Sequence, residues 1–212
     1  MLDTLRRGGI TDERVLHAMA TVPRELFVPA GAEGEAYADR ALAIDCGQTI
    51  SQPLIVAAVV QALAIVPGER ILDVGTGSGY QAAVLAACGG LVVGIERLPA
   101  LADAARGRLL RAGFDVAVHV GDGSLGLADH APFDAIAVAA TAPWVPPALA
   151  RQLRAGGRLV IPLHREGDSA DELTRLRVVG GRWITDSLGP CRFVPLIGGD
   201  AYSDTGISSR AP

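Results

Sequence analysis

The sequence predicts a doubly wound α/β fold, in which helices cover both faces of a mostly parallel sheet. From residue 67 onward, short apolar runs alternate with amphipathic stretches of helical length. Runs that are apolar at almost every position are typical of strands buried on both faces of a parallel sheet, and the helices supply the crossovers. A glycine-rich segment, Gly75–Gly79, directly follows one of these runs, where such folds commonly bind a ligand.

The N-terminal part, residues 1–66, is expected to be a helical appendage. Residues 11–20 read TDERVLHAMA, in which Thr11 can cap a short amphipathic helix and the acidic pair after it suits the positive helix end. A second helix is predicted from Pro53 to Ala64, because proline is favoured at the first helical position. This segment is apolar nearly all round, so we expect it to be buried.

Strands and helices are predicted in alternation over residues 67–163. The strands are the runs ERILDVG, LVVGIE, VAVHVGDG, FDAIAVAA and GRLVIPL, and the helices cover residues 80–87, 99–112 and 147–153. The runs ELTRLRVV and GRWITDSLG then predict a final antiparallel pair with a turn at Gly180-Gly181. We expect one domain over residues 1–197, with the sheet in 67–197, and a flexible polar tail over 198–212.

Composition excludes several classes of protein. The chain has 212 residues, 50% hydrophobic and 20% charged, which fits a single globular domain. The net charge is −4 and the 19 basic residues, all arginine, are dispersed, so nucleic acid binding is not indicated. Apolar runs stay below the roughly 18 residues of a membrane span, and MLDTLRRGG lacks the apolar core of a secretory signal. We expect a cytoplasmic monomer with no membrane partner.

The three cysteines do not indicate a disulfide framework or a metal site. Cys46, Cys88 and Cys191 are odd in number and far apart, without a C-x-x-C pair or companion histidines at ligand spacing. The sequence therefore predicts no bound metal.

Three successive strand ends place ligand-binding groups at one edge of the predicted sheet. The turn reads G-x-G-x-G over Gly75–Gly79, which differs from the dinucleotide fingerprint, and the chain has no Walker lysine. Glu96, 19 residues after Gly77, can accept hydrogen bonds from both hydroxyls of a ribose. Asp122 follows the next strand and can accept from the exocyclic amine of adenine. Each group alone is more often a cap or a tight turn, but together they predict a site for a nucleoside carrying an amino acid.

The segment Asp73–Tyr80, together with Glu96, resembles the first two motifs of class I S-adenosylmethionine-dependent methyltransferases. Five landmarks resemble the protein-L-isoaspartate O-methyltransferase family over residues 4–197, namely Asp39-Arg40, Gly47-Gln48-Thr49-Ile50-Ser51-Gln52-Pro53, Gly75–Ala83, Gly121-Asp122-Gly123 and Arg192-Phe193-Val194-Pro195-Leu196. The resemblance implies a Rossmann-like sheet of seven strands. It also implies methyl transfer from S-adenosylmethionine to the α-carboxylate of L-isoaspartyl residues in damaged proteins, which initiates repair through a succinimide.

The resemblance also implies roles for individual residues. Ser51 is the expected catalytic residue, and the expected substrate-binding residues are Gln48, Thr49, Ile50 and Thr141. The expected cofactor-binding residues are Asp73, Gly75, Thr76, Gly77, Ser78, Glu96, Asp122 and Gly123. Two alternatives stay open, because Ser51 or Gln52 can simply cap the helix that begins at Pro53, and Thr49 can serve turn packing.

This chemistry requires positioning more than proton transfer. A carboxylate with a pKa of about 4 is already ionised at neutral pH, so no general base is required. What remains is alignment of the two reacting atoms and their partial desolvation. The histidines are therefore expected to be structural or surface residues, namely His17, His119, His130 and His164.

The segment after Pro162 departs from the family pattern. Relatives have a glycine-rich loop with Gly-Gly-x-Gln there, whereas this chain has charged residues over 163–172. This departure leaves the choice of peptide open. Two other functions therefore stay possible: an aspartyl O-methyltransferase acting on one dedicated peptide, as in natural-product maturation, and a non-catalytic module that binds the cofactor or a peptide.

Overall fold

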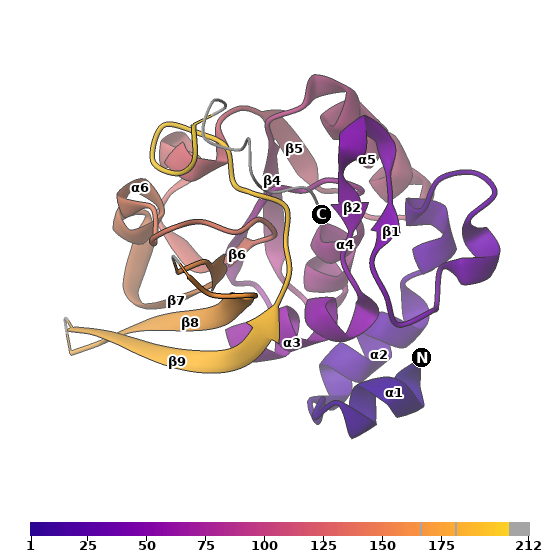
Figure 1. Cartoon of the computed structure of the whole chain (residues 1–212), viewed down its shortest axis with the longest axis horizontal. Helices are drawn as coiled ribbons and strands as arrows, with labels where there is room; N and C mark the ends of the chain where they lie inside the picture. The colour runs from indigo at the N-terminus through magenta and orange to yellow at the C-terminus, as the bar shows by residue number, and fades with distance from the viewer. Residues whose placement is uncertain (166, 181, 204–212) are drawn as a thin grey trace.

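A seven-stranded sheet forms the centre of the protein (Figure 1). The computed structural model describes residues 1–203 except 166 and 181. The strands follow the order β5-β4-β3-β6-β7-β8-β9, and the first five are parallel, namely β3 (Arg70–Val74), β4 (Leu91–Glu96), β5 (Ala117–Val120), β6 (Phe133–Val138) and β7 (Leu153–Leu163). The antiparallel strands β8 (Asp171–Val179) and β9 (Arg182–Cys191) complete the sheet, which confirms the predicted fold class.

Six α-helices accompany the sheet within the described residues. They are α1 (Leu2–Arg7), α2 (Glu13–Thr21), α3 (Pro53–Leu63), α4 (Tyr80–Ala87), α5 (Pro99–Arg111) and α6 (Pro147–Arg151). Short 3-10 helices span Arg24–Phe27, Glu33–Glu35, Asp45–Gly47, Gly123–Leu125 and Ala128–His130, and a separate ribbon pairs β1 (Leu42–Ala43) with β2 (Thr49–Ile50). None of these helices combines the length and apolar character that crossing a bilayer requires.

Apolar side chains of the strands alternate between two cores, one on each face of the sheet. Ile71 belongs to the core formed with α2, α3, α4 and α5, whereas its neighbour Leu72 belongs to the core that includes Leu149 of α6. All six residues of the central strand β6 are buried. In Figure 1, α1 and α2 lie together at one end of the molecule, and the β8–β9 hairpin projects from the other side.

The order of the strands determines where a ligand can bind. The chain moves outward from β3 through β4 to β5 and then returns to β6, which pairs with β3 on its other side. The connections leaving β3 and β6 therefore diverge, and a crevice opens beyond the carboxyl ends of these strands.

The N-terminal helices differ from the sequence expectation in two details. Helix α1 was not predicted. Asp12 caps α2 in place of Thr11: Asp12 Oδ1 accepts a hydrogen bond from Arg14 N at 2.9 Å. The backbone N–H of Thr11 instead donates to Gln61 Oε1 of α3 at 2.7 Å. A long-range contact with α3 therefore fixes the chain one residue before the cap.

Residues 198–203 depart from the expected flexible tail. The N–H of Gly199 donates to Asp122 Oδ2 at 2.7 Å. A Cβ at Gly198 would lie 1.9 Å from Asp122 Oδ1, so only glycine permits this close approach. Residues 198–203 pack against the protein because the backbone N–H of Gly199 donates to the carboxylate of Asp122, a contact that amino-acid composition does not reveal. The rest of the predicted tail, 204–212, lies outside the described residues.

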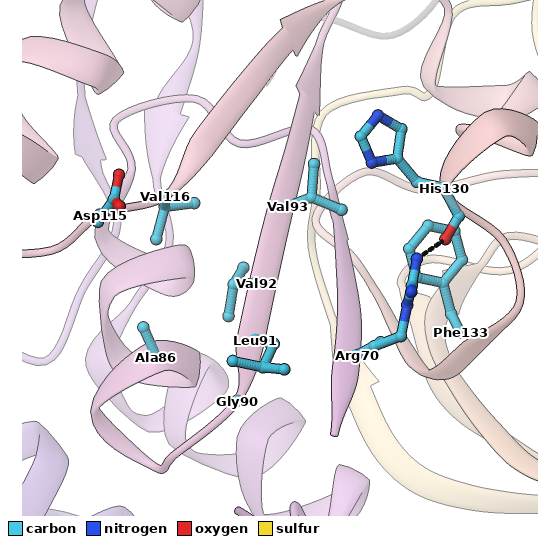
Figure 2. Close-up of a pocket in the computed structure, with 10 residues that line it drawn as sticks. All are labelled: Arg70, Ala86, Gly90, Leu91, Val92, Val93, Asp115, Val116, His130 and Phe133. Atoms are coloured by element: carbon cyan, nitrogen blue, oxygen red, sulfur yellow. Dashed lines mark hydrogen bonds between the residues drawn. The ribbon is translucent and has the colours of Figure 1, made fainter. Parts of the chain in front are cut away.

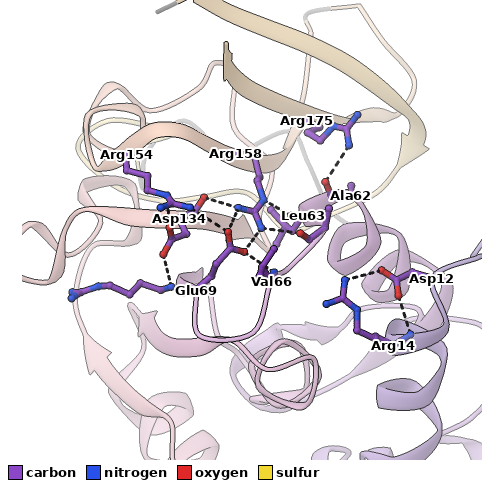
Figure 3. A network of polar contacts seen from close by, with 12 residues as sticks. Asp12, Arg14, Ala62, Leu63, Val66, Glu69, Asp134, Arg154, Arg158 and Arg175 are labelled. Carbon is purple, nitrogen blue, oxygen red and sulfur yellow. Dashed lines mark hydrogen bonds and ion pairs between the residues drawn. The ribbon is translucent and has the colours of Figure 1, made fainter. Parts of the chain in front are cut away.

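A network of ion pairs connects the end of α3 to the sheet (Figure 3). Arg158 of β7 donates from Nη1 to Glu69 Oε1 at 2.7 Å and from Nη2 to Ala64 O at 3.0 Å, and Arg154 also pairs with Glu69. The side chains of Arg158 and Glu69 are only 12% and 10% exposed. Burial acts to raise the pKa of Glu69, but hydrogen bonds from Arg158 and from the Val66 N–H outweigh it and hold the pKa below its usual value.

We predict that Arg158→Met lowers the free energy of unfolding by about 3 kcal/mol at pH 7, because it leaves a nearly buried carboxylate without its main partner. The native pKa of Glu69 is lowered, so this stabilisation is complete above the ordinary glutamate pKa of about 4.3. It is lost as the pH falls through the lowered native pKa. Urea unfolding of both proteins should therefore give a smaller difference at pH 3 than at pH 7, and equal differences would contradict the prediction.

Candidate active site

A cavity of about 670 Å³ opens at the carboxyl ends of β3, β4 and β6. Its walls come from the glycine-rich turn after β3, the end of β4, the turn that contains Thr141, the 47–51 loop and the segment 192–197. A volume of this size is typical of sites that hold a small-molecule ligand. The cavity also lies at the crevice that the order of the strands creates.

A second hollow, of about 370 Å³, lies at the amino ends of the strands (Figure 2). Its walls include the apolar side chains of Leu91, Val92 and Val93. The guanidinium of Arg70 also lines it but donates a hydrogen bond to the carbonyl of His130. Gly90 and Asp115 also line this hollow, but they precede β4 and β5, whereas ligands of open α/β sheets bind at the carboxyl ends of the strands, so the larger cavity is the candidate active site.

The glycine-rich turn presents bare backbone to the larger cavity. Gly75, Gly77 and Gly79 have φ values of 77°, 53° and 93°, in the left-handed region that side chains rarely adopt. The N–H of Gly75 donates to Ile95 O at 2.9 Å, which fastens the turn to β4. The Ser78 hydroxyl accepts from Tyr80 N at 3.2 Å and keeps its own proton for a ligand.

Glu96, at the end of β4, is fixed by two backbone donors. Its Oε2 accepts from Gly77 N at 2.9 Å and its Oε1 accepts from Leu98 N at 3.0 Å. The side chain lines the cavity, with 6% of the residue exposed. Each carboxylate oxygen has a second lone pair, so Glu96 can still accept two hydroxyl donors.

Asp73 lies behind the turn and does not line the cavity. It is fully buried, and its Oδ1 accepts from Gln81 Nε2 at 2.7 Å, while Oδ2 has no partner among the described residues. Burial raises the pKa of Asp73 to about 6, against the opposing effect of hydrogen bonds from Gln81 and Thr76. Asp73 thus holds Gln81, whose side chain lines the cavity, and supports the turn from below.

Asp122 is likewise set back from the cavity, whereas Gly123 lines it. Asp122 caps the short 3-10 helix after β5: its Oδ1 accepts from Ser124 N at 2.9 Å and from Ser124 Oγ at 2.7 Å. Its Oδ2 accepts from Gly199 N. The arrangement matches a helix cap, and the role of Asp122 toward adenine stays a prediction.

The loop that carries Ser51 forms the opposite wall. Gln48, Thr49, Ile50 and Ser51 all line the cavity, and pairing of β1 with β2 holds them there through Ala43 opposite Thr49. Ser51 is partly buried, and within the described part of the chain its hydroxyl makes no hydrogen bond to protein. The hydroxyl is therefore free to contact a ligand.

Helix α3 is capped by Asp39 rather than by Ser51 or Gln52. Asp39 Oδ1 accepts from Leu54 N at 3.0 Å, and Asp39 Oδ2 accepts from Gln52 Nε2 at 2.9 Å. Neither Ser51 nor Gln52 makes a side-chain capping bond to this helix. The capping interpretation of Ser51 is thus wrong, because a carboxylate from an earlier loop takes that role.

Thr141 joins the cavity to the C-terminal segment. Its N–H donates to Val194 O at 2.8 Å, and its carbonyl accepts from Leu196 N at 2.8 Å. Its hydroxyl is buried and lies 3.4 Å from Pro162 O. Thr141 lines the cavity, as predicted, but its polar groups mainly hold the 193–197 segment in place.

The sequence missed the role of His164. It was expected to be structural or at the surface, but it lines the cavity with its Nδ1 3.0 Å from Asp171 Oδ1. Asp171 Oδ2 in turn accepts from Phe193 N at 3.0 Å. The departure of residues 163–172 from the family pattern was the available signal, since a changed loop at a strand end faces the ligand edge. Residue 166 of this loop lies outside the described residues.

Comparisons with known proteins agree with this geometry. A family model described as Protein-L-isoaspartate(D-aspartate) O-methyltransferase (PCMT) matches residues 1–201. A protein-L-isoaspartate O-methyltransferase of Roseiflexus castenholzii is 52% identical over 204 residues, which cover 96% of this chain and 93% of the relative. A protein-L-isoaspartate O-methyltransferase of Koribacter versatilis is 53% identical over 208 residues, which cover 96% of this chain and 91% of the relative.

Solved structures give the same result. The solved structure of a protein-L-isoaspartate O-methyltransferase superposes on this chain with a TM-score of 0.84 at 27% sequence identity. The superposition covers 94% of this chain and 65% of that longer chain. A Plasmodium falciparum structure described as the same kind of enzyme, in complex with S-adenosyl-L-homocysteine, gives a TM-score of 0.79 at 28% identity, with 92% and 96% covered. Because the family model covers residues 1–201, a range that contains the glycine-rich turn, Glu96 and the Ser51 loop, and the Roseiflexus and Koribacter relatives are 52% and 53% identical, the chain belongs to the protein-L-isoaspartate(D-aspartate) O-methyltransferase family.

Proposed function

We propose that this enzyme transfers a methyl group from S-adenosylmethionine to the α-carboxylate of L-isoaspartyl residues in damaged proteins, which initiates repair through a succinimide. Its family consists of S-adenosylmethionine-dependent protein O-methyltransferases. One observation carries the proposal: a single cavity is bounded by the glycine-rich turn and Glu96 on one side and by the Ser51 loop on the other. Donor and acceptor bound there share one partly enclosed space.

The donor set of the cavity fits S-adenosylmethionine. Bare backbone at Gly75 and Gly77 leaves space for its methionine part, and the Ser78 hydroxyl can donate to it. Glu96 keeps one acceptor position on each oxygen for the ribose hydroxyls. We assign the adenine edge to Gly123, with Asp122 as a predicted acceptor behind it. Asp73 supports the turn from below through Gln81, whereas Thr76 lines the cavity and stays a predicted cofactor-binding residue.

The chain itself has little acid–base chemistry to perform. When bound, S-adenosylmethionine supplies an electrophilic methyl group on a sulfonium whose leaving group is a neutral thioether. The acceptor carboxylate has a pKa of about 4 and is ionised at neutral pH, so no general base is required. The free Ser51 hydroxyl can donate to this carboxylate and orient it without protonating it. Such positioning can lower the barrier by roughly 7–11 kcal/mol.

The peptide side of the cavity supports a second candidate. His164, Asp168 and Asp171 line it, in the segment where this chain departs from the glycine-rich loop that the family resemblance implies, so the chain presents charge to the peptide. This observation favours testing an aspartyl O-methyltransferase that acts on one dedicated peptide.

We further propose that the enzyme works as a monomer in the cytoplasm.

We predict that the enzyme methylates a peptide containing L-isoaspartate and leaves the matched L-aspartyl peptide unmodified. Labelled S-adenosylmethionine and release of labelled methanol from the ester measure both reactions. Methylation of the aspartyl peptide alone would reject repair in favour of the dedicated-peptide function. Cofactor binding by calorimetry without methylation of either peptide would support a non-catalytic binding module.

Glu96 and Ser51 are predicted to affect different parameters. Glu96→Gln should weaken binding of S-adenosyl-L-homocysteine by about 1–3 kcal/mol, because the new amide places an N–H group against the backbone donors that the carboxylate accepts. Ser51→Ala should lower kcat while changing this affinity by less than about twofold, because its hydroxyl is expected to contact only the acceptor. Calorimetry and steady-state kinetics measure the two effects.

Glu13→Gln is the matched control, because Glu13 is an exposed residue that does not line the cavity. Unchanged affinity in Glu96→Gln would remove Glu96 from the cofactor site. A Ser51→Ala enzyme with wild-type kcat and a lowered melting temperature would assign Ser51 a structural role only.

A further inference from the structure

Arg24 is a fully buried arginine whose guanidinium lies behind the Ser51 loop. Its Nη2 donates to Ser51 O at 2.8 Å, and its Nε donates to Ala36 O at 2.6 Å. A planar guanidinium can reach two carbonyls in a fixed geometry, which a flexible ammonium cannot. Arg24 therefore fixes the backbone of Ser51 relative to the loop that contains Ala36.

The same guanidinium also contacts the cofactor side of the cavity. Its Cζ lies 4.6 Å from the centroid of the Tyr80 ring, within the range of a cation–π interaction. Tyr80 is the first residue of α4, directly after the glycine-rich turn, and it lines the cavity. Arg24 is thus in contact with both walls, through the carbonyl of Ser51 on one side and the ring of Tyr80 on the other.

The charge of Arg24 is not neutralised by a carboxylate in contact with it. Within the described parts of the chain, Arg24 has no ion pair, and its buried Nη1 has no hydrogen-bond partner. Burial raises the pKa of Tyr80 to about 12, so its phenol stays neutral and offers no counter-charge. Buried charges are normally paired, and an unpaired one is a cost to folding. The two carbonyls require only N–H donors, and the Tyr80 ring gives the charge a cation–π contact but no counter-ion.

We propose that Arg24 is a positioning residue for methyl transfer, which holds the Ser51 loop against α4 and whose charge, with Asp39 acting on it only from beyond ion-pair distance, favours binding of the acceptor carboxylate. The inference rests on the proposed function, because the acceptor is an anion bound beside Ser51. Arg24 does not line the cavity, so it acts through Ser51 and Tyr80 and not on the reacting atoms.

Two substitutions separate the charge of Arg24 from its hydrogen bonds. Arg24→Met removes both, so KM for the isoaspartyl peptide should rise and kcat should fall, each by about tenfold or more. Arg24→Lys keeps the positive charge but lacks the planar guanidinium that reaches both carbonyls. The peptide KM should therefore stay closer to the wild-type value than in Arg24→Met, while kcat stays low. The affinity for S-adenosyl-L-homocysteine, measured by calorimetry, should change by less than about threefold in both variants.

Arg158→Met is the matched control, because Arg158 is also a largely buried arginine that donates to backbone carbonyls but does not line the cavity. It should lower the melting temperature and leave kcat and KM unchanged below the transition. If folded Arg24→Met keeps both parameters within threefold of the wild type, or if Arg158→Met reproduces its losses, the proposal is overturned.

Two further outcomes are decisive. If Arg24→Met does not fold, the test of the proposal rests on Arg24→Lys. A lowered kcat at an unchanged peptide KM in this variant supports the proposal, and an unchanged kcat overturns it. The wild-type enzyme is assayed first with the same peptide. Absence of methylation by the wild type rejects the proposed function and this inference together, whereas equal activity of wild type and variants rejects the role of Arg24 alone.

Discussion

The hydrogen bond from the Gly77 N–H to Glu96 Oε2 joins the turn after β3 to the end of the neighbouring strand β4. Gly77 has a φ of 53°, in the left-handed region that side chains rarely adopt, and in this conformation its backbone N–H faces the carboxylate. It fixes the carboxylate and the bare turn as one rigid wall. The parallel pairing of β3 and β4 brings the two ends together, so the half of the cavity that contains the glycine-rich turn and Glu96 follows from strand order.

The half of the cavity that carries the Ser51 loop has a different origin, because it comes from the N-terminal segment and not from the sheet. Asp39 supplies the cap of α3 and thereby frees the Ser51 hydroxyl from that role. Arg24 binds the Ser51 carbonyl and stacks on Tyr80, where the two halves meet. The N-terminal helical part, which looks like an appendage in the sequence, therefore completes the site.

Local patterns in the sequence were sufficient to predict much of the fold. Helix α4 and strand β4 have the predicted bounds because each is a short apolar run, with Gly79, Gly89, Gly90 and Pro99 close to its ends. Glu96 was found in the same way, from its position at a strand end. Arg24 contacts Ser51, 27 residues away in the sequence, and Asp39 caps a helix through Leu54, 15 residues away. The residues next to Arg24 and Asp39 in the sequence do not indicate these contacts. The contact of His164 with the cavity was missed for a different reason: the changed loop over 163–172 was a local signal, but the sequence does not show which of its side chains faces the cavity.

The bond between Gly199 and Asp122 determines how far the chain can be shortened at its C-terminal end. The family landmarks stop before this glycine, so a boundary chosen from motifs alone would remove it. Asp122 would then lose its Gly199 donor, and Trp144 would lose the carbonyl of Asp200 to which its indole N–H donates. Gly123, next to Asp122, forms part of the cavity wall. An expression boundary for this enzyme should therefore lie beyond residue 203.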